Sequence, residues 1–378
     1  MRRIDPILES KLKEYYGEKA GLILRNLLKP PSEERYRIPG EEVTIRGPNR
    51  SITLSAEEIL ERAKDGRSKF ELKRVAGEVF LVAKTIEGKS RRDNELEDLY
   101  IDRIGSTRAM LGRSVRGKNI VAPKEAKPGK KYNVSTYRGP FIGIGLLVER
   151  PGSSKTALYM QNSPRYLPDL RGSDLHEIAA VHPIPRGPTL SILEEDVEGK
   201  EVAIIPAPGD MGLAVLLAKR GAKVSIATTL QGLARRVEKI KKRLGIEINL
   251  YKLRPEDLPG EYDLVIVNPI SSDIGIRPQP YVKFLGSKVR KFLKIAKKYA
   301  EIGLSRLKPK GHMIFVINTV DPRELSASLG EAMKNYIDVA PIDPGLEGIE
   351  IKLSNRLYGT LVTRDEGPYF IVSRLAFS

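Results

Sequence analysis

The chain has 378 residues, of which 40% are hydrophobic and 30% are charged. This balance is typical of globular proteins, and the length suits about two or three domains with cores of their own. The chain contains no Cys and three His. We therefore exclude disulfides, Cys-ligated zinc or iron–sulfur sites and a thiol nucleophile, and we expect no metal site.

The charge of the chain is strongly positive, with 65 Lys and Arg against 48 Asp and Glu, a net charge of +17. An excess of this size predicts an anionic partner, for which nucleic acid is the usual choice. The composition also fits a thermophile surface, but such surfaces are enriched in both signs together. Because the chain has no apolar stretch of about 18 residues and no signal-peptide core, we expect a cytoplasmic protein that does not enter a membrane.

Residues 1–98 are expected to form a small α/β module. Apolar residues recur there at helical spacing, and alternating or apolar runs indicate strands. Ser55-Ala56-Glu57-Glu58 is a capping box, a typical helix start. The expected elements are helical residues 4–28 with a break near Gly17, a strand at 42–46, a helix at 56–64 and a strand at 77–85.

Residues 99–155 show a different sequence pattern, in which short apolar runs alternate with Gly and Pro turns. This pattern predicts a small β-barrel. A cluster of basic side chains on such a barrel would bind phosphates, with strong salt dependence. We expect phosphate contacts from Arg113, Arg116, Lys118, Lys124, Lys130, Lys131 and Arg138, and the family resemblance described below implies that the phosphates are those of RNA.

Strands and helices alternate in residues 190–378, which predicts a doubly wound, mostly parallel α/β sheet. The helices at 230–244 and 284–307 are strongly basic. A solvated surface and contact with phosphates explain them equally well. The expected strands are 202–206, 224–228, 263–267, 313–317 and 369–374, and further helices are expected at 213–220 and from 321.

Several short strings occur in an order found in one protein family. Leu158–Pro164 precedes the sheet, and Ala207-Pro208-Gly209 follows its first strand. Asn268–Pro278 follows the strand at 263–267, and Asn318-Thr319-Val320 comes at the end of the strand at 313–317. Over roughly residues 5–375 the chain resembles the Nol/Nop/Sun (NSUN) family of RNA cytosine-5 methyltransferases. It is most similar to the type with an inserted PUA domain that acts on the 3′ end region of tRNA.

The resemblance implies a Rossmann-like methyltransferase sheet and a PUA-like RNA-binding barrel. The barrel would begin near Val115 and end with a strand at 141–145. The implied domains are residues 1–98, 99–155 and 156–378. The implied partner is RNA, either the acceptor region of tRNA or ribosomal RNA, the latter in a ribosome or another ribonucleoprotein.

The catalytic positions implied by the resemblance are degenerate. The family attacks cytosine with one Cys and releases the product with another, and these positions correspond to Asn318 and Ser271 here. An Asn side chain is not a nucleophile, and a Ser needs an adjacent base that neither motif supplies. The Asp of the fourth-strand motif corresponds to Asn268. We therefore expect a pseudoenzyme, a methyltransferase-like protein without activity.

The positions that would hold S-adenosylmethionine are also changed. The second strand ends at Thr228-Thr229, without the acid that binds ribose hydroxyls in folds of this kind. Ala203 stands where the family has Asp, and Met211 where it has Lys. We expect no cofactor; the weak candidates for binding one are Ala207, Pro208, Gly209 and Asp210.

Three other side chains are candidates for RNA contact. Gln161 and Asn162 precede the sheet, where their amides would either meet a base edge or lie in a buried turn. Arg277 matches the family motif beside the active site, and an Arg there would stack on a base or pair with phosphate.

Three functions remain open. The first is a non-catalytic RNA-binding protein, which the degenerate positions favour. The second is an active S-adenosylmethionine-dependent RNA methyltransferase that modifies an amine or hydroxyl, chemistry that needs no Cys, with Asn268, Asp273 and Arg277 as its site. The third is an interaction subunit whose sheet is an assembly surface and whose charge serves solubility.

Overall fold

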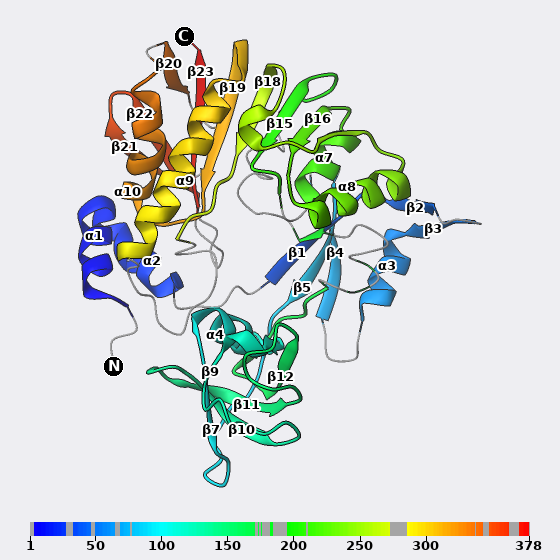
Figure 1. Ribbon diagram of the computed structural model, residues 1–378, viewed down its shortest axis with the longest axis vertical. Coiled ribbons are helices and arrows are strands. Elements are labelled where there is room, and N and C mark those ends of the chain that lie inside the picture. Colours follow the sequence, from blue (N-terminus) through cyan, green and yellow to red (C-terminus); the bar gives the residue numbers. More distant parts are fainter. Residues whose placement is uncertain are drawn as a thin grey trace.

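The computed structural model of the chain describes residues 4–27, 33–46, 50–64, 69–75, 78–170, 173, 175, 182–183, 195–208, 211–272, 286–336, 338–342, 348–362 and 370–377. It is a mixed α/β molecule with a large sheet at one end and a smaller, separate sheet at the other (Figure 1). No helix in the described part of the chain is long and apolar enough to cross a membrane.

The large sheet has the strand order β17-β16-β15-β18-β19-β23-β22-β21, and β20 also pairs with β23. The strands from β15 to β19 are parallel, and β23 runs antiparallel to β19. The predicted strands of this half are confirmed, with shifted ends. The bounds are β15 (Glu201–Ile205), β16 (Lys223–Ala227), β17 (Ile248–Tyr251), β18 (Tyr262–Val267), β19 (Leu307–Ile317), β20 (Val339–Ile342), β21 (Ile349–Ser354), β22 (Leu357–Val362) and β23 (Phe370–Phe377).

Helices cover both faces of this sheet. Alternate residues of a strand point to opposite faces, so each strand contributes side chains to the cores on both sides. Val202 and Ile204 of β15 belong to the core under α7 (Gly212–Lys219) and α8 (Gln231–Leu244). Ala203 and Ile205 belong to the core on the other face, under α9 (Gly286–Leu304). Four short turns complete this half, namely η3 (Pro255–Asp257), α10 (Pro322–Leu325), η4 (Ser326–Gly330) and α11 (Glu331–Met333).

The N-terminal helices pack against the large sheet. The predicted helical region is α1 (Pro6–Tyr16), the turn η1 (Gly17–Lys19) and α2 (Ala20–Leu27), with the break at Gly17 as expected. Their apolar side chains join the core on the α9 face, and the Tyr16 hydroxyl donates to the Val320 carbonyl at 2.8 Å. The helices lie beside α9 and α10 in Figure 1, apart from the strands that follow them in sequence.

The strands that follow form a four-stranded sheet of order β14-β1-β5-β4 and a hairpin of β2 and β3. The predicted capping box is confirmed, since the Ser55 hydroxyl accepts from the Glu58 N–H and the Glu58 carboxylate accepts from the Ser55 N–H. The bounds are β1 (Glu33–Ile38), β2 (Glu42–Arg46), β3 (Ser51–Ser55), α3 (Ala56–Ala63), β4 (Lys69–Val75), β5 (Glu78–Lys84) and β14 (His182–Pro183).

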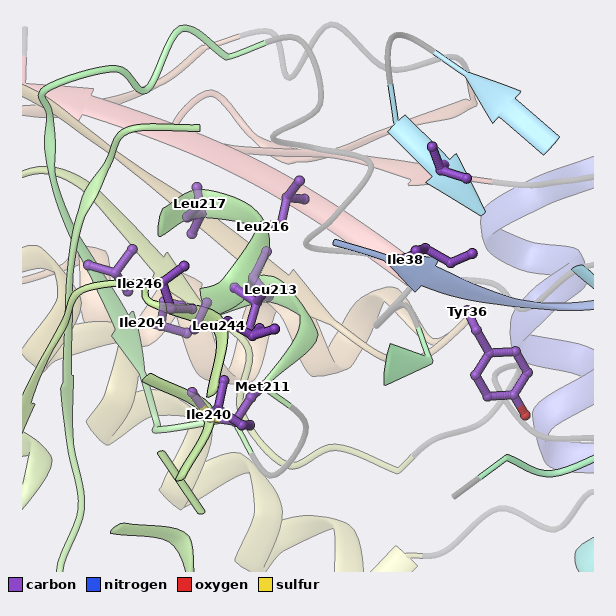
Figure 2. Packing of buried hydrophobic residues seen from close by; sticks show 14 of the residues in the cluster. Tyr36, Ile38, Ile204, Met211, Leu213, Leu216, Leu217, Ile240, Leu244 and Ile246 are labelled. Carbon is purple, nitrogen blue, oxygen red and sulfur yellow. The ribbon is translucent and has the colours of Figure 1, made fainter. Parts of the chain in front are cut away.

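This module shares its core with the α7/α8 face of the large sheet. Tyr36 and Ile38 of β1 lie in the same apolar cluster as Leu213 and Leu216 of α7 (Figure 2). The module therefore buries its apolar surface against residues about 170 positions away in sequence. Burial of this kind is the main force that holds the two parts together.

The second sheet has six strands in the order β8-β12-β11-β10-β7-β9 and a core of its own around Leu99, Val134 and Leu158. It includes residues 156–162, beyond the expected border at 155. The bounds are β7 (Asp98–Ile101), α4 (Arg103–Met110), β8 (Val115–Arg116), η2 (Gly117–Asn119), β9 (Ile120–Ala122), β10 (Lys131–Thr136), β11 (Phe141–Leu147) and β12 (Thr156–Asn162). A short pair, β6 (Ile86–Glu87) and β13 (Arg165–Tyr166), connects chain segments that enter and leave this sheet.

Candidate functional site

The predicted catalytic positions lie together at one edge of the large sheet. Asn268 and Ser271 follow β18, and Asn318 follows β19. The two strands are parallel neighbours, so their carboxyl ends meet at the edge where open α/β sheets bind ligands.

The Asn268 and Ser271 side chains are bonded to backbone carbonyls at the end of β19. The Asn268 side-chain amide donates to the Val316 carbonyl at 2.9 Å, and the Ser271 hydroxyl donates to the Asn318 carbonyl at 2.9 Å. Ser271 is 4% exposed. A serine nucleophile needs a base that takes its proton, whereas this hydroxyl donates to an amide oxygen. The arrangement holds the ends of β18 and β19 together.

A buried carboxyl that the sequence analysis did not single out lies beside them. Glu324 of α10 is 2% exposed, and its carboxyl accepts from the Ser272 N–H at 3.1 Å, the Thr319 hydroxyl at 2.8 Å and the Ser272 hydroxyl. Burial raises the pKa of Glu324 to about 7, against the opposing effect of the hydrogen bonds from Ser272 and Thr319. In the sequence, Glu324 looked only like an acidic residue in the first turn of a helix.

The neighbouring acid has a structural partner. Asp321 is 2% exposed, accepts from the Arg323 N–H as the N-cap of α10, and forms an ion pair with the Arg323 guanidinium at 2.5 Å. Asp321 is therefore engaged within the segment that follows β19, whereas Glu324 also binds Ser272 in the loop that follows β18.

The described residues at the ends of β15 and β16 do not fit S-adenosylmethionine. Thr228 uses its hydroxyl to accept from the Leu230 N–H at 3.1 Å, and Leu230 is 67% exposed. Pro206, Ala207 and Pro208 follow β15. None of these side chains offers the acceptor pair that two ribose hydroxyls require.

Met211 is a further position at which the cofactor region differs from the resembling family. It takes the position of a family Lys, is fully buried and packs in the core with α7 and α8. An apolar side chain there stabilises the core but offers no charge to a cofactor. Gly209, Asp210, Asp273 and Arg277 lie outside the described residues. Among the side chains that are described, no group of three or more His, Asp or Glu is arranged to hold a metal ion.

Most of the expected RNA contacts lie on the six-stranded sheet and are exposed. Residues 98–162 contain twelve Lys and Arg but four Asp and Glu. Within the described part of the chain, no carboxylate lies within 4.0 Å of the cationic groups of these six exposed residues: Arg116, Lys118, Lys124, Lys130, Lys131 and Arg138. Gln161 and Asn162 are also exposed, at the end of β12.

Arg113 differs from the other expected contacts. It is 8% exposed, forms an ion pair with Glu34 of β1, and donates to the carbonyls of Leu167 at 3.1 Å and Pro168 at 3.0 Å. Its guanidinium links the six-stranded sheet to the N-terminal module. We therefore no longer expect Arg113 to contact RNA, because its charge is buried and partnered.

The two basic helices lie on opposite faces of the large sheet. Exposed cations of α8 are Arg235, Lys239 and Lys242, and those of α9 include Arg290, Lys291 and Lys294. Because α8 packs on one core and α9 on the other, the sheet separates these two groups.

Comparison with solved structures shows the fold of the whole chain. NSun6 from Pyrococcus horikoshii, crystallised with SFG, an analogue of S-adenosylmethionine, matches with a TM-score of 0.75 at 15% identity, covering 99% of this chain and 98% of that chain. A methyltransferase homolog protein from the same organism matches with a TM-score of 0.54 at 12% identity, covering 99% and 95%. Comparisons with models of protein families and with curated proteins find no match.

The fold is that of a methyltransferase. The expected Rossmann-like architecture is confirmed, with the smaller sheet and the N-terminal elements inside the matched length. At these identities the likeness establishes the fold alone, and the chemistry of this chain depends on its own side chains.

Proposed function

We propose that this chain is an RNA-binding protein built on an RNA methyltransferase fold and that it does not transfer methyl groups. Its partner is tRNA or ribosomal RNA. The observation that carries the proposal is the buried Ser271 hydroxyl, which donates to the Asn318 backbone carbonyl at one of the two corresponding positions, while Asn318 at the other has no nucleophilic atom.

The chemistry of cytosine C5 methylation supports inactivity. Addition to C6 of the base requires a strong nucleophile, which a partly ionised Cys thiol provides at neutral pH. Ser271 is buried and donates to a backbone carbonyl, and Asn318 has no nucleophilic atom. The described strand ends also lack a carboxylate for the ribose of the cofactor. The reaction requires both a nucleophile and a bound cofactor, and these changes affect each of the two.

The exposed cations of the six-stranded sheet support RNA binding. We assign residues 98–162 to a PUA-like unit that contacts the phosphates through the exposed basic side chains named above. Release of counterions from RNA would supply the affinity, while phosphate contacts fix orientation without reading sequence. A cytoplasmic location and association with a ribonucleoprotein belong to the same proposal.

Two measurements on the purified protein test this proposal. We expect bulk tRNA to bind with an affinity that falls steeply between 50 and 200 mM salt, by about 10³-fold or more if six phosphates are contacted. We expect no transfer of labelled methyl groups from S-adenosylmethionine to tRNA or ribosomal RNA, with a cysteine-containing enzyme of this fold as the positive control. Methyl transfer to either RNA would refute inactivity, and no binding to either would refute the RNA partner.

One observation favours a second candidate, an active enzyme that methylates an amine. The Asn268 amide nitrogen is bonded to Val316, while no described residue donates to its side-chain oxygen. That oxygen would accept from an exocyclic amine of a base. If methylation of any RNA is detected, Asn268→Ala should abolish it, and Asn335→Ala, at an exposed Asn that follows α11, serves as the matched control. Activity that survives Asn268→Ala would exclude this site.

The interaction-subunit alternative predicts a different result. A complex isolated from lysate should then survive digestion of all RNA. Our proposal predicts instead that nuclease treatment disperses the complex.

A further inference from the structure

An exposed cluster of aromatic and cationic side chains lies at the turn between β10 and β11. Tyr137 is 47% exposed, and the guanidinium carbon of Arg138 lies 5.4 Å from the centroid of its ring. Tyr100 of β7 contacts Tyr137 edge to face, with ring centroids 6.5 Å apart and planes at 86°. We call Tyr100, Tyr137 and Arg138 the Tyr137 cluster.

The backbone of this turn is held in an unfavourable conformation. Arg138 has φ +58°, and among the described non-glycine residues only Lys310 also has a positive φ. L-residues with side chains avoid this left-handed region. Two hydrogen bonds close the turn. The Thr136 N–H donates to the Pro140 carbonyl at 3.1 Å, and the Gly139 N–H donates to the Thr136 carbonyl at 2.8 Å. Retained strain of this kind is concentrated at functional sites.

Further cations lie next to the Tyr137 cluster. The Tyr137 N–H donates to the Ile101 carbonyl at 2.9 Å. The N–H of the same peptide unit, which belongs to Asp102, donates to the Asn119 carbonyl at 2.8 Å. This peptide unit therefore links Tyr137 to Asn119, the neighbour of exposed Lys118 in the turn η2. The phosphate contacts proposed above and the exposed ring belong to one surface.

The nearby carboxylates are already bonded. Asp102 accepts from the Gly105 N–H at 2.7 Å and from the Asn119 side-chain amide at 3.0 Å. Asp98 pairs with Arg92 and accepts from the Tyr100 hydroxyl at 3.3 Å. Arg138 and Lys118 have no carboxylate partner in the described structure. The surface around the ring is therefore positive.

We propose that the Tyr137 cluster is a stacking platform for an unpaired RNA base, with Lys118 on a phosphate of the same strand. The proposal rests on the RNA-binding function above and specifies single-stranded nucleotides as the substrate of this surface. A planar guanidinium over an aromatic ring offers a flat face on which any base stacks. Bases inside an RNA duplex are not accessible to such a face, whereas loops and ends are.

The test uses the full chain and a short single-stranded RNA labelled with 2-aminopurine, whose fluorescence falls on stacking. The matching duplex is the second ligand. The variants are Tyr137→Ala, Tyr137→Phe and Arg138→Gly. Tyr15→Ala, at a half-exposed tyrosine of α1, is the control.

Loss of a base stack should weaken single-stranded binding of Tyr137→Ala by about five-fold or more and remove the quenching. Duplex binding should not change, and Tyr137→Phe and Tyr15→Ala should bind like the parent chain. Arg138→Gly should weaken binding while it raises stability, because glycine tolerates the positive φ. A purely structural role would lower stability and binding together.

Three results would overturn the platform. In the first, Tyr137→Ala binds the single strand as tightly as the parent chain does. In the second, Tyr137→Ala loses the same factor on duplex and single strand. In the third, a protein partner but no RNA depends on Tyr137. In the first two cases the proposed RNA-binding function stands, whereas a parent chain that binds neither RNA at low salt refutes that function as well.

Discussion

The Ser271 hydroxyl donates to the Asn318 carbonyl oxygen at 2.9 Å, and this bond joins the two positions that correspond to the catalytic cysteines of the resembling family. The loops after β18 and β19 are thereby fixed to each other. The next residue of each loop is bonded as well: the hydroxyls of Ser272 and Thr319 lie 3.1 Å apart, and the Thr319 hydroxyl donates to the Glu324 carboxyl. At this edge the Ser271 hydroxyl takes part in a hydrogen bond that stabilises the fold, and the Asn318 side chain offers no nucleophile.

Removal of the Ser271 hydroxyl should destabilise the chain. Ser271→Ala leaves the Asn318 carbonyl without this donor at a buried site, which costs about 1 kcal/mol of the free energy of unfolding. Urea denaturation measures the change. Ser154→Ala, at an exposed serine, should have no effect. If Ser271→Ala were as stable as the parent chain, the hydroxyl would not hold the two loops together.

The buried Glu324 should make stability depend on pH. Its pKa is about 7 in the folded chain against the ordinary 4.5, so the folded state binds more protons between these values. The contribution of Glu324 to the free energy of unfolding therefore falls as pH rises from about 4.5 to about 7, by up to about 3 kcal/mol, and is constant outside this window.

Glu324→Gln removes this titration. The difference in unfolding free energy between the parent chain and Glu324→Gln should shift in favour of the variant as pH rises through the window. Glu331→Gln, at an exposed Glu of α11, should leave the parent profile unchanged there. A constant difference between parent and Glu324→Gln from pH 5 to 7.5 would contradict the raised pKa.

Arg113 should contribute to stability and not to RNA affinity. Arg113→Ala leaves Glu34 and the carbonyls of Leu167 and Pro168 without their buried partner, which costs about 3 kcal/mol. Chemical denaturation measures the loss, and the exposed Arg150→Ala is the control. For the folded fraction of Arg113→Ala, tRNA binding should keep the salt dependence of the parent chain; a smaller salt slope would place Arg113 on phosphate.

Lys118 should show the opposite pattern. Lys118→Ala removes one exposed cation, so the slope of log affinity for tRNA against log salt should decrease by about one, with unchanged stability. The control is Lys334→Ala, at an exposed Lys that follows α11 and is paired with Glu331. It should leave the slope unchanged. Equal slopes for parent and Lys118→Ala would exclude a phosphate contact at this residue.

The sequence predicted the local elements well where periodicity and capping agree. The strand at 42–46 and the helix at 230–244 were found almost residue for residue. β1 was missed, because its run of Glu and Arg does not show the alternation of a half-buried strand. The strand predicted at 313–317 begins six residues earlier, at Leu307, because tertiary pairing with β18 overrides the preference of Pro309 and Gly311.

Long-range packing was not available from the sequence. Nothing in the spacing of Leu8 and Leu12 shows that they pack on the α9 face and not on the strands that follow them. Arg113 looked like the other basic residues because its partner Glu34 lies 79 positions away. Glu324 and the Tyr137 cluster likewise depend on neighbours brought together by the fold.

Calorimetric titration of the purified chain with S-adenosylmethionine, alone and with saturating tRNA, tests the central claim most directly. We predict that tRNA binds and that the cofactor gives no heat of binding in either condition, because the described strand ends lack acceptors for its ribose. A dissociation constant in the micromolar range, equivalent to about −8 kcal/mol, would contradict the account and identify the chain as a methyltransferase with different chemistry.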